Sequence, residues 1–74
     1  MIIVSSPLKR DFFKEYVPTL VMGEDTFTFE KEVGLKLYFN TTAEDLDAAV
    51  RFLKDTLRKS EYGRALYFIV EKAA

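Results

Sequence analysis

The chain of 74 residues contains neither cysteine nor histidine, and these two absences exclude several classes of functional site. Without cysteine there can be no disulfide framework and no thiolate nucleophile. Without histidine the chain lacks the commonest metal ligand and general base, so Ser/His pairs, Cys/His pairs and zinc clusters cannot be built. The composition therefore predicts a protein that is not an enzyme and that binds no cofactor or metal.

Glycine is scarce as well, and the glycines stand far apart, at Gly23, Gly34 and Gly63. Because a phosphate-binding loop needs several closely spaced glycines, this spacing predicts no such loop. Carboxylates remain as candidates for acid–base or metal chemistry, in the adjacent pairs Glu24–Asp25 and Glu44–Asp45. The first pair fits an exposed turn and the second fits the start of a helix, so we interpret both as structural.

Long apolar runs and an excess of charge of one sign are also missing. The opening run Met1–Val4 is short and has no basic residues before it, so it predicts neither a signal peptide nor a membrane span. A net charge of −1 gives no overall attraction to nucleic acid or to an anionic membrane. A cytoplasmic protein is the resulting expectation.

What is present is typical of one folded domain. Hydrophobic residues make up 49% of the chain and charged residues 31%, an ordinary globular balance that predicts a single domain over residues 1–74. Glutamine is absent and Asn40 is the only side-chain amide, while Glu and Lys are frequent. This bias is found in proteins from hot environments, and chance in a short chain explains it equally well.

The strongest secondary-structure pattern lies in Thr41–Lys59, where we predict one amphipathic helix. Apolar residues recur there at helical spacings of four, three and four, at Leu46, Val50, Leu53 and Leu57. Thr41 or Thr42 is the predicted N-cap, and acids near the start with bases near the end suit the helix dipole. An apolar stripe of this length requires a sheet on which to pack.

A first strand is predicted at Met1–Val4, followed by a short helix over Pro7–Tyr16. Ser6 before Pro7 is typical of a helix start, with serine as the N-cap and proline in the first turn. Leu8, Phe12 and Tyr16 recur every four residues along this helix. Pro18 favours an extended Val17 and so ends it.

Three extended segments follow, at Val17–Met22, Thr26–Lys31 and Val33–Asn40. Their period-two alternation, with Gly23 in the first connection and Gly34 in a turn or a bulge, predicts antiparallel strands. A last strand, Arg64–Glu71, is apolar on both sides, which predicts a central position or a covered second face. The sequence thus predicts an α+β fold in the order β-α-β-β-β-α-β, with an antiparallel-rich sheet and the long helix across one face.

Two surfaces are candidates for binding. Arg51, Lys54 and Arg58 share a helix side within about 60° of arc around Asp47. This basic side is either a solvated helix face or a site for phosphates or an acidic protein. Phe52, on the opposite flank, is either the edge of the core or an anchor for a partner.

The second surface is the sheet face away from the long helix. If the phenylalanines and leucines of the strands face that helix, the reverse face carries Thr26, Thr28, Lys36, Tyr38, Tyr67 and Ile69. A face of this composition tolerates water but favours a cover. The N-terminal helix, a second copy of the chain or a partner could provide that cover.

The leading interpretation is a non-catalytic protein-interaction domain that binds a partner protein or itself. Inhibitors, adaptors and oligomer subunits, including virus-encoded ones, are often domains of this size, which is an analogy of size alone. The predicted binding residues are Lys36, Tyr38, Arg51, Phe52, Lys54, Arg58 and Tyr67.

The alternative is a single-stranded RNA- or DNA-binding module. It would use Tyr38 and Tyr67 as stacking platforms, beside Lys36 and Arg64. The glycine–aromatic strand motif of RNA-recognition modules is not present in the sequence. Carboxylate–metal hydrolysis is a remote third option.

Overall fold

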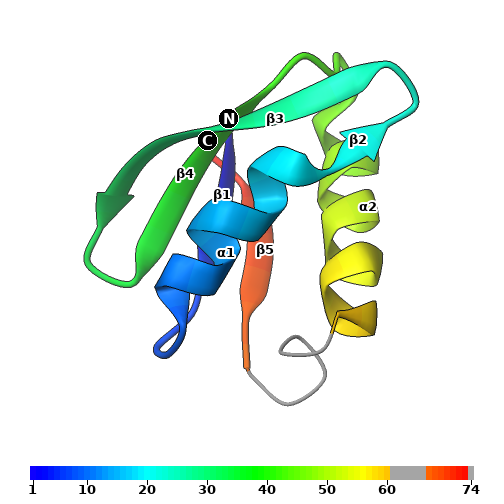
Figure 1. Cartoon of the computed structure of the whole chain (residues 1–74). Helices are drawn as coiled ribbons and strands as arrows, with labels where there is room; N and C mark the ends of the chain where they lie inside the picture. Colours follow the sequence, from blue (N-terminus) through cyan, green and yellow to red (C-terminus); the bar gives the residue numbers. More distant parts are fainter. Residues whose placement is uncertain (61–66, 74) are drawn as a thin grey trace.

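The computed structural model describes residues 1–60 and 67–73 and has the predicted α+β architecture. The elements in chain order are β1 (Ile2–Ser5), α1 (Arg10–Tyr16), the 3₁₀ helix η1 (Val17–Thr19), β2 (Val21–Met22), β3 (Asp25–Val33), β4 (Lys36–Thr41), α2 (Leu46–Lys59) and β5 (Ile69–Lys72) (Figure 1). The predicted order is confirmed, with η1 in place of the first part of an extended segment. The predicted turn at Gly63 and the start of the last predicted strand lie outside the described residues.

The five strands form one antiparallel sheet in the order β2-β3-β4-β1-β5. The short apolar strand β1 lies between β4 and β5, whereas β5 is at an edge of the sheet. The prediction that the last strand is central is therefore wrong. Nor do the described residues cover its second face, since Ile69 of β5 is 43% exposed.

Both helices pack against the same face of the sheet, which we call the covered face (Figure 1). Helix α2 buries Ala49, Leu53 and Leu57 there, so the predicted packing of the long helix is confirmed. Helix α1 buries Phe13, whose ring lies 5.6 Å from that of Phe68, just before β5. The N-terminal helix therefore does not cover the reverse face, which was one of the three covers considered.

Alternate side chains of the strands reach the core from the covered face. The strand residues in it are Ile2, Val4, Phe27, Leu37, Phe39 and Val70. Ile2 is directly opposite Phe39 on β4, and Val4 is directly opposite both Leu37 and Val70. Each buried aliphatic or aromatic side chain of this kind contributes roughly 1.5–3 kcal/mol to folding.

Helix α1 begins at Arg10 rather than at the predicted Pro7. Ser6 does not cap it, because its hydroxyl donates to Leu8 O at 2.7 Å. The backbone N–H of Ser6 donates to Leu35 O, which ties this residue to the end of the sheet. Lys9 then turns the chain into the helix with a φ of 60°, in the left-handed region.

Helix α2 begins at Leu46, so the prediction of Thr41 or Thr42 as its N-cap is wrong. The cap is Asp45, whose carboxylate accepts from the backbone N–H of Ala48 at 3.1 Å. Thr41 belongs to β4, where pairing with β3 holds it extended. Thr42 instead extends the pairing of β4 with β3, and its hydroxyl oxygen accepts from the Thr26 N–H at 3.0 Å.

The β3–β4 hairpin turns at Gly34, which has a φ of 58°. The bulge that this glycine was considered to mark is elsewhere, since the register shifts between Phe29 and Lys31. Beyond the bulge Glu32 is opposite Leu37 and shares its covered face. Leu35, which was expected to face the helix with the other leucines, is exposed instead, and so is Val33.

Candidate functional site: the open face of the sheet

The reverse of the covered face, which we call the open face, is organised in rows of directly opposite residues. The first row crosses four strands as Lys31, Tyr38, Ile3 and Glu71. Opposite residues of an antiparallel pair project from the same side of a sheet, so these four side chains lie together on the open face. Neither helix packs over them.

The second row runs parallel to the first and lies nearer the β3–β4 turn. It consists of Val33, Lys36, Ser5 and Ile69, again from four adjacent strands. Val33 and Ile69 occupy its two ends and are both exposed. The second row therefore carries apolar side chains at its ends and polar ones at its centre, the reverse of the first row.

Ile3 is at the centre of the open face. It does not belong to the core cluster that contains its neighbours Ile2 and Val4, yet only 7% of it is exposed. Its cross-strand neighbours are Tyr38 on one side and Glu71 on the other. We attribute its burial to these cross-strand neighbours, since no helix packs on this face.

Ser6 gathers further exposed apolar residues at the end of the second row. Its N–H donates to Leu35 O at 3.1 Å, and its hydroxyl lies 2.7 Å from Leu8 O and 3.2 Å from Tyr67 O. These three residues are all exposed, and Tyr67 is the most exposed of them at 70%. Leu8 lines the depression beside α1, so it is not part of the open face. We define the apolar end as Val33, Leu35, Tyr67 and Ile69, four large hydrophobic residues that are exposed near this end of the sheet.

Polar side chains on the open face carry both signs of charge. Lys31 places its ammonium 4.9 Å from the centre of the Tyr38 ring, in a cation–π contact. Asn40 donates to Glu30 at 2.6 Å, next to the bulge. Lysines therefore lie toward β3 and β4, and Glu71 lies at the opposite edge on β5.

The residues predicted from sequence to bind a partner fall into separate groups. Lys36 and Tyr38 are on the open face, and Tyr67 lies at its apolar end. Arg51, Lys54 and Arg58 are exposed on the outer side of α2, away from that face. Among them Asp47 forms an ion pair with Lys72 at 3.0 Å, which reduces the positive charge of this side.

Phe52 is part of the packing between α2 and the sheet. Its ring stacks on that of Phe27, with centroids 5.9 Å apart and an interplanar angle of 1°. Phe52 is half-buried and packs against the core cluster. Of the two interpretations of this residue, the edge of the core describes its position.

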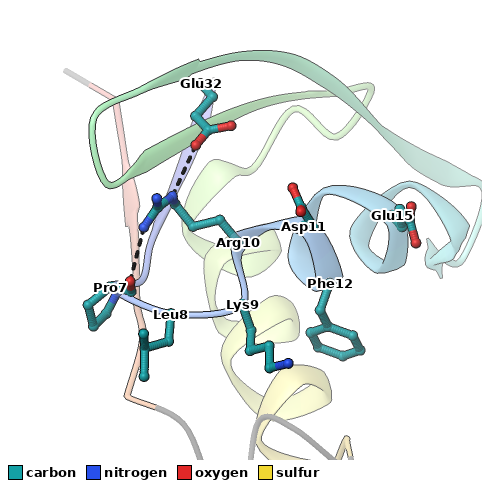
Figure 2. Close-up of a pocket in the computed structure, with 8 residues that line it drawn as sticks. All are labelled: Pro7, Leu8, Lys9, Arg10, Asp11, Phe12, Glu15 and Glu32. Atoms are coloured by element: carbon teal, nitrogen blue, oxygen red, sulfur yellow. Dashed lines mark hydrogen bonds and ion pairs between the residues drawn. The ribbon is translucent and has the colours of Figure 1, made fainter.

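A depression of about 630 Å³ lies beside α1 (Figure 2). Arg10 points across it to Glu32, with Nε donating to Oε2 at 3.0 Å, and its Nη1 donates to the carbonyl oxygens of Ser6 and Pro7. Lys14 donates to the other oxygen of Glu32 at 3.0 Å. Lys14 also pairs with Asp11 at 3.3 Å, so two cations balance two carboxylates in a network that fastens α1 to β3.

The same network shifts the titration of two of its members. Hydrogen bonds, first from Lys14 and then from Arg10, hold the pKa of the Glu32 carboxyl below its ordinary value of 4.5. Hydrogen bonds to Glu32 and then to Asp11 raise the pKa of Lys14 above 10.5. Both shifts favour the charged forms of the two side chains, and the ion pairs between these forms hold α1 against β3.

Sequence reasoning missed five residues of the two rows, namely Ile3, Ser5, Lys31, Val33 and Glu71. A signal for Ile3 was present, since a continuous apolar run at Met1–Val4 places apolar side chains on both faces of a strand. Lys31 and Val33 reach the open face only because of the bulge. No feature of the sequence marks that bulge.

Within residues 1–60 and 67–73, no three acidic side chains lie close enough together to hold a metal ion. Over the same residues, no helix has both the length and the apolar character needed to cross a membrane. No protein-family model, curated protein sequence or solved structure matches this chain.

Proposed function

We propose that this chain is a non-catalytic protein-interaction domain that binds a protein partner through the open face of its sheet. The observation that carries the proposal is the exposure of Ile69, Val33 and Tyr67 on a face that both helices leave uncovered. Adaptors, inhibitors and oligomer subunits act by such contacts. We expect it to act in the cytoplasm.

The size of the exposed apolar surface supports this proposal. The four side chains of the apolar end, each roughly half exposed or more, leave on the order of 400 Å², the size of the largest apolar patch on a typical monomeric protein. Such a patch is often functional, particularly where it has a polar rim. Tyr38, Lys31 and Lys36 supply such a rim here.

Nucleic-acid binding has less support. Base stacking on Tyr38 requires an accessible ring, and Lys31 already lies over that ring. Glu30 and Glu71 would repel phosphates near this face. Arg64, a further basic residue in this alternative, lies outside the described residues.

The proposal is tested by comparing two charge insertions in the tagged, full-length chain. Ile69→Asp places a carboxylate in the apolar end, and Val21→Asp places one at another exposed apolar position, on β2 at the far edge of the sheet. We expect wild type and Val21→Asp to retain the same proteins from a lysate of the native host, and Ile69→Asp to lose them. Circular dichroism verifies that both variants are folded.

Equal retention by the two variants would contradict the proposal. A parallel titration with single-stranded RNA and DNA, at low and high salt, addresses the alternative. Tight binding that weakens with salt and with Tyr38→Ala would favour the nucleic-acid function instead.

A further inference from the structure

We propose that the partner of the open face is a second copy of this chain, packed face to face about a two-fold axis that runs along the strands between β1 and β4. This inference rests on the proposed function and names its partner. It follows from the order of side chains in the two rows. When a row is laid over a reversed copy of itself, each side chain meets one of compatible chemistry.

A two-fold axis in the plane between two stacked sheets places each row over its own reverse. In the first row, Lys31 then lies over Glu71 of the second copy, and Tyr38 lies over Ile3 of the second copy. The symmetry repeats each contact, so one dimer contains two lysine–glutamate pairs. Both tyrosines cover the central isoleucines.

The second row is self-complementary under the same operation. Val33 lies over Ile69 of the second copy, and Lys36 lies over Ser5 of the second copy. Apolar side chains therefore meet apolar ones at both ends of this row. No pair of like charges is brought together in either row.

Within one chain Lys31 and Glu71 of the first row are too far apart to form an ion pair. Strands lie about 4.8 Å apart, so three strand spacings separate the backbones of Lys31 and Glu71 by about 14 Å. In a dimer of stacked sheets, at the usual separation of about 10 Å, two long side chains can meet between the layers. A second copy thus provides a partner for Glu71 that the described chain does not.

The same charge order decides between kinds of partner. An acidic partner would meet Glu71 and Glu30, and a basic one would meet Lys31 and Lys36. A second copy places Glu71 over Lys31 and leaves Lys36 over the uncharged Ser5, so neither row brings like charges together. The apolar end and the two rows together also approach the roughly 800 Å² per partner that a stable interface buries, since the apolar end alone exposes on the order of 400 Å².

The test is a charge-swap experiment on the full chain by sedimentation, from about 1 μM to about 1 mM. We expect wild type to form dimers. Lys31→Glu and Glu71→Lys should each weaken self-association about tenfold or more, because two contacts per dimer become repulsive. Lys54→Glu, which reverses an exposed charge on the outer side of α2, should leave it unchanged.

Mixing the two weakened variants is the decisive step. In the mixed dimer the introduced glutamate of one variant lies over the introduced lysine of the other. The unchanged Glu71 of the first variant lies over the unchanged Lys31 of the second, so both contacts are attractive again. Labelling one variant with ¹⁵N gives the mixed dimer a distinct mass in native mass spectrometry. We expect this species to dominate over either variant paired with itself.

Two results would overturn the inference. A wild type that stays monomeric over the whole range rules out a second copy as the partner. Dimers that are insensitive to both charge reversals rule out this arrangement. In either case the proposed function is judged separately, because loss of captured proteins on Ile69→Asp would support another partner on the same face.

Discussion

The two faces of the central strand β1 differ in what lies over them, although adjacent residues on it are almost equally buried. Ile2 is 0% exposed beneath the helices, and Ile3 is 7% exposed on a face with no helix over it. At the centre of a sheet, cross-strand neighbours alone can shield a side chain. The difference between the faces is visible only toward the edge, where Ile69 is 43% exposed on β5. Burial of a central residue therefore does not establish that its face is covered.

The largest expected effect is a difference in the free energy of unfolding between substitutions on the covered face and on the open face. Ile2→Ala removes a fully buried side chain beneath the helices, and we expect it to lower the free energy of unfolding by about 2–5 kcal/mol. Ile69→Ala, the same change at the open edge, should cost less than about 1 kcal/mol in the monomer. Urea denaturation of both variants at low protein concentration measures the difference. Equal losses would mean that the open face contributes to the core as much as the covered face does.

The second prediction concerns the aromatic contact between α2 and the covered face. Phe52→Ala removes the ring that stacks on Phe27, and we expect a loss of about 2 kcal/mol in the free energy of unfolding. Phe52→Leu retains apolar contact and should lose less. A variant of unchanged stability that fails to bind a partner would instead make Phe52 an anchor.

A smaller effect is expected at the start of α2, the helix that gives the covered face its cover. Asp45→Ala removes the side chain that accepts from the Ala48 N–H and should cost about 1 kcal/mol. Asp45→Asn keeps an acceptor of similar geometry and is the matched control. Thermal denaturation should place the asparagine variant closer to wild type, and equal melting of all three proteins would show that this cap adds no stability.

The smallest effect concerns the attachment of α1 and depends on pH. Glu32 has a lowered pKa in the folded state, so its contribution to stability is present above pH 4.5 and is lost as the pH falls through the lower folded-state value. Lys14 has a raised pKa, so its contribution is present below pH 10.5 and is lost as the pH rises through the higher folded-state value. We expect Glu32→Gln to melt slightly below wild type at pH 7, with a difference that disappears in acid. Melting temperatures over a pH series measure this.

Glu15→Gln is the control for that series. Glu15 is exposed and lines the same depression, but it takes no part in the Glu32 network. Its substitution should leave the pH dependence unchanged. A difference between Glu32→Gln and wild type that persists undiminished in acid would contradict the proposed role of the Glu32 carboxylate.

Patterns that depend on local spacing could be predicted from the sequence. The apolar stripe of α2 and the alternation of Phe27 and Phe29 give the right elements, because a side chain's direction follows from its position along a helix or strand. Element order and fold class follow from these patterns. The positions of Leu53, Leu57 and Phe39 in the core follow as well.

Features that depend on competition between neighbouring segments could not be predicted. Thr41 and Thr42 are good caps in isolation, but pairing with β3 engages both, and Asp45 takes their role. Strand order is another such feature. The first strand and the predicted last strand, Arg64–Glu71, both read as apolar on two sides, and nothing local decides which one is central. The open face follows from these choices, so only part of its composition was predictable.

The bulge in β3 determines on which face of the sheet each side chain between it and the hairpin turn lies. In an unbroken ladder Glu30 would be opposite Tyr38 and Glu32 opposite Lys36, so β3 would place two carboxylates on the open face. One extra residue instead delivers a carboxylate to α1 and a lysine to the exterior, with no change in composition. The strand register therefore determines which charges the open face carries, and two chains of near-identical sequence would present different surfaces if only one of them kept the bulge.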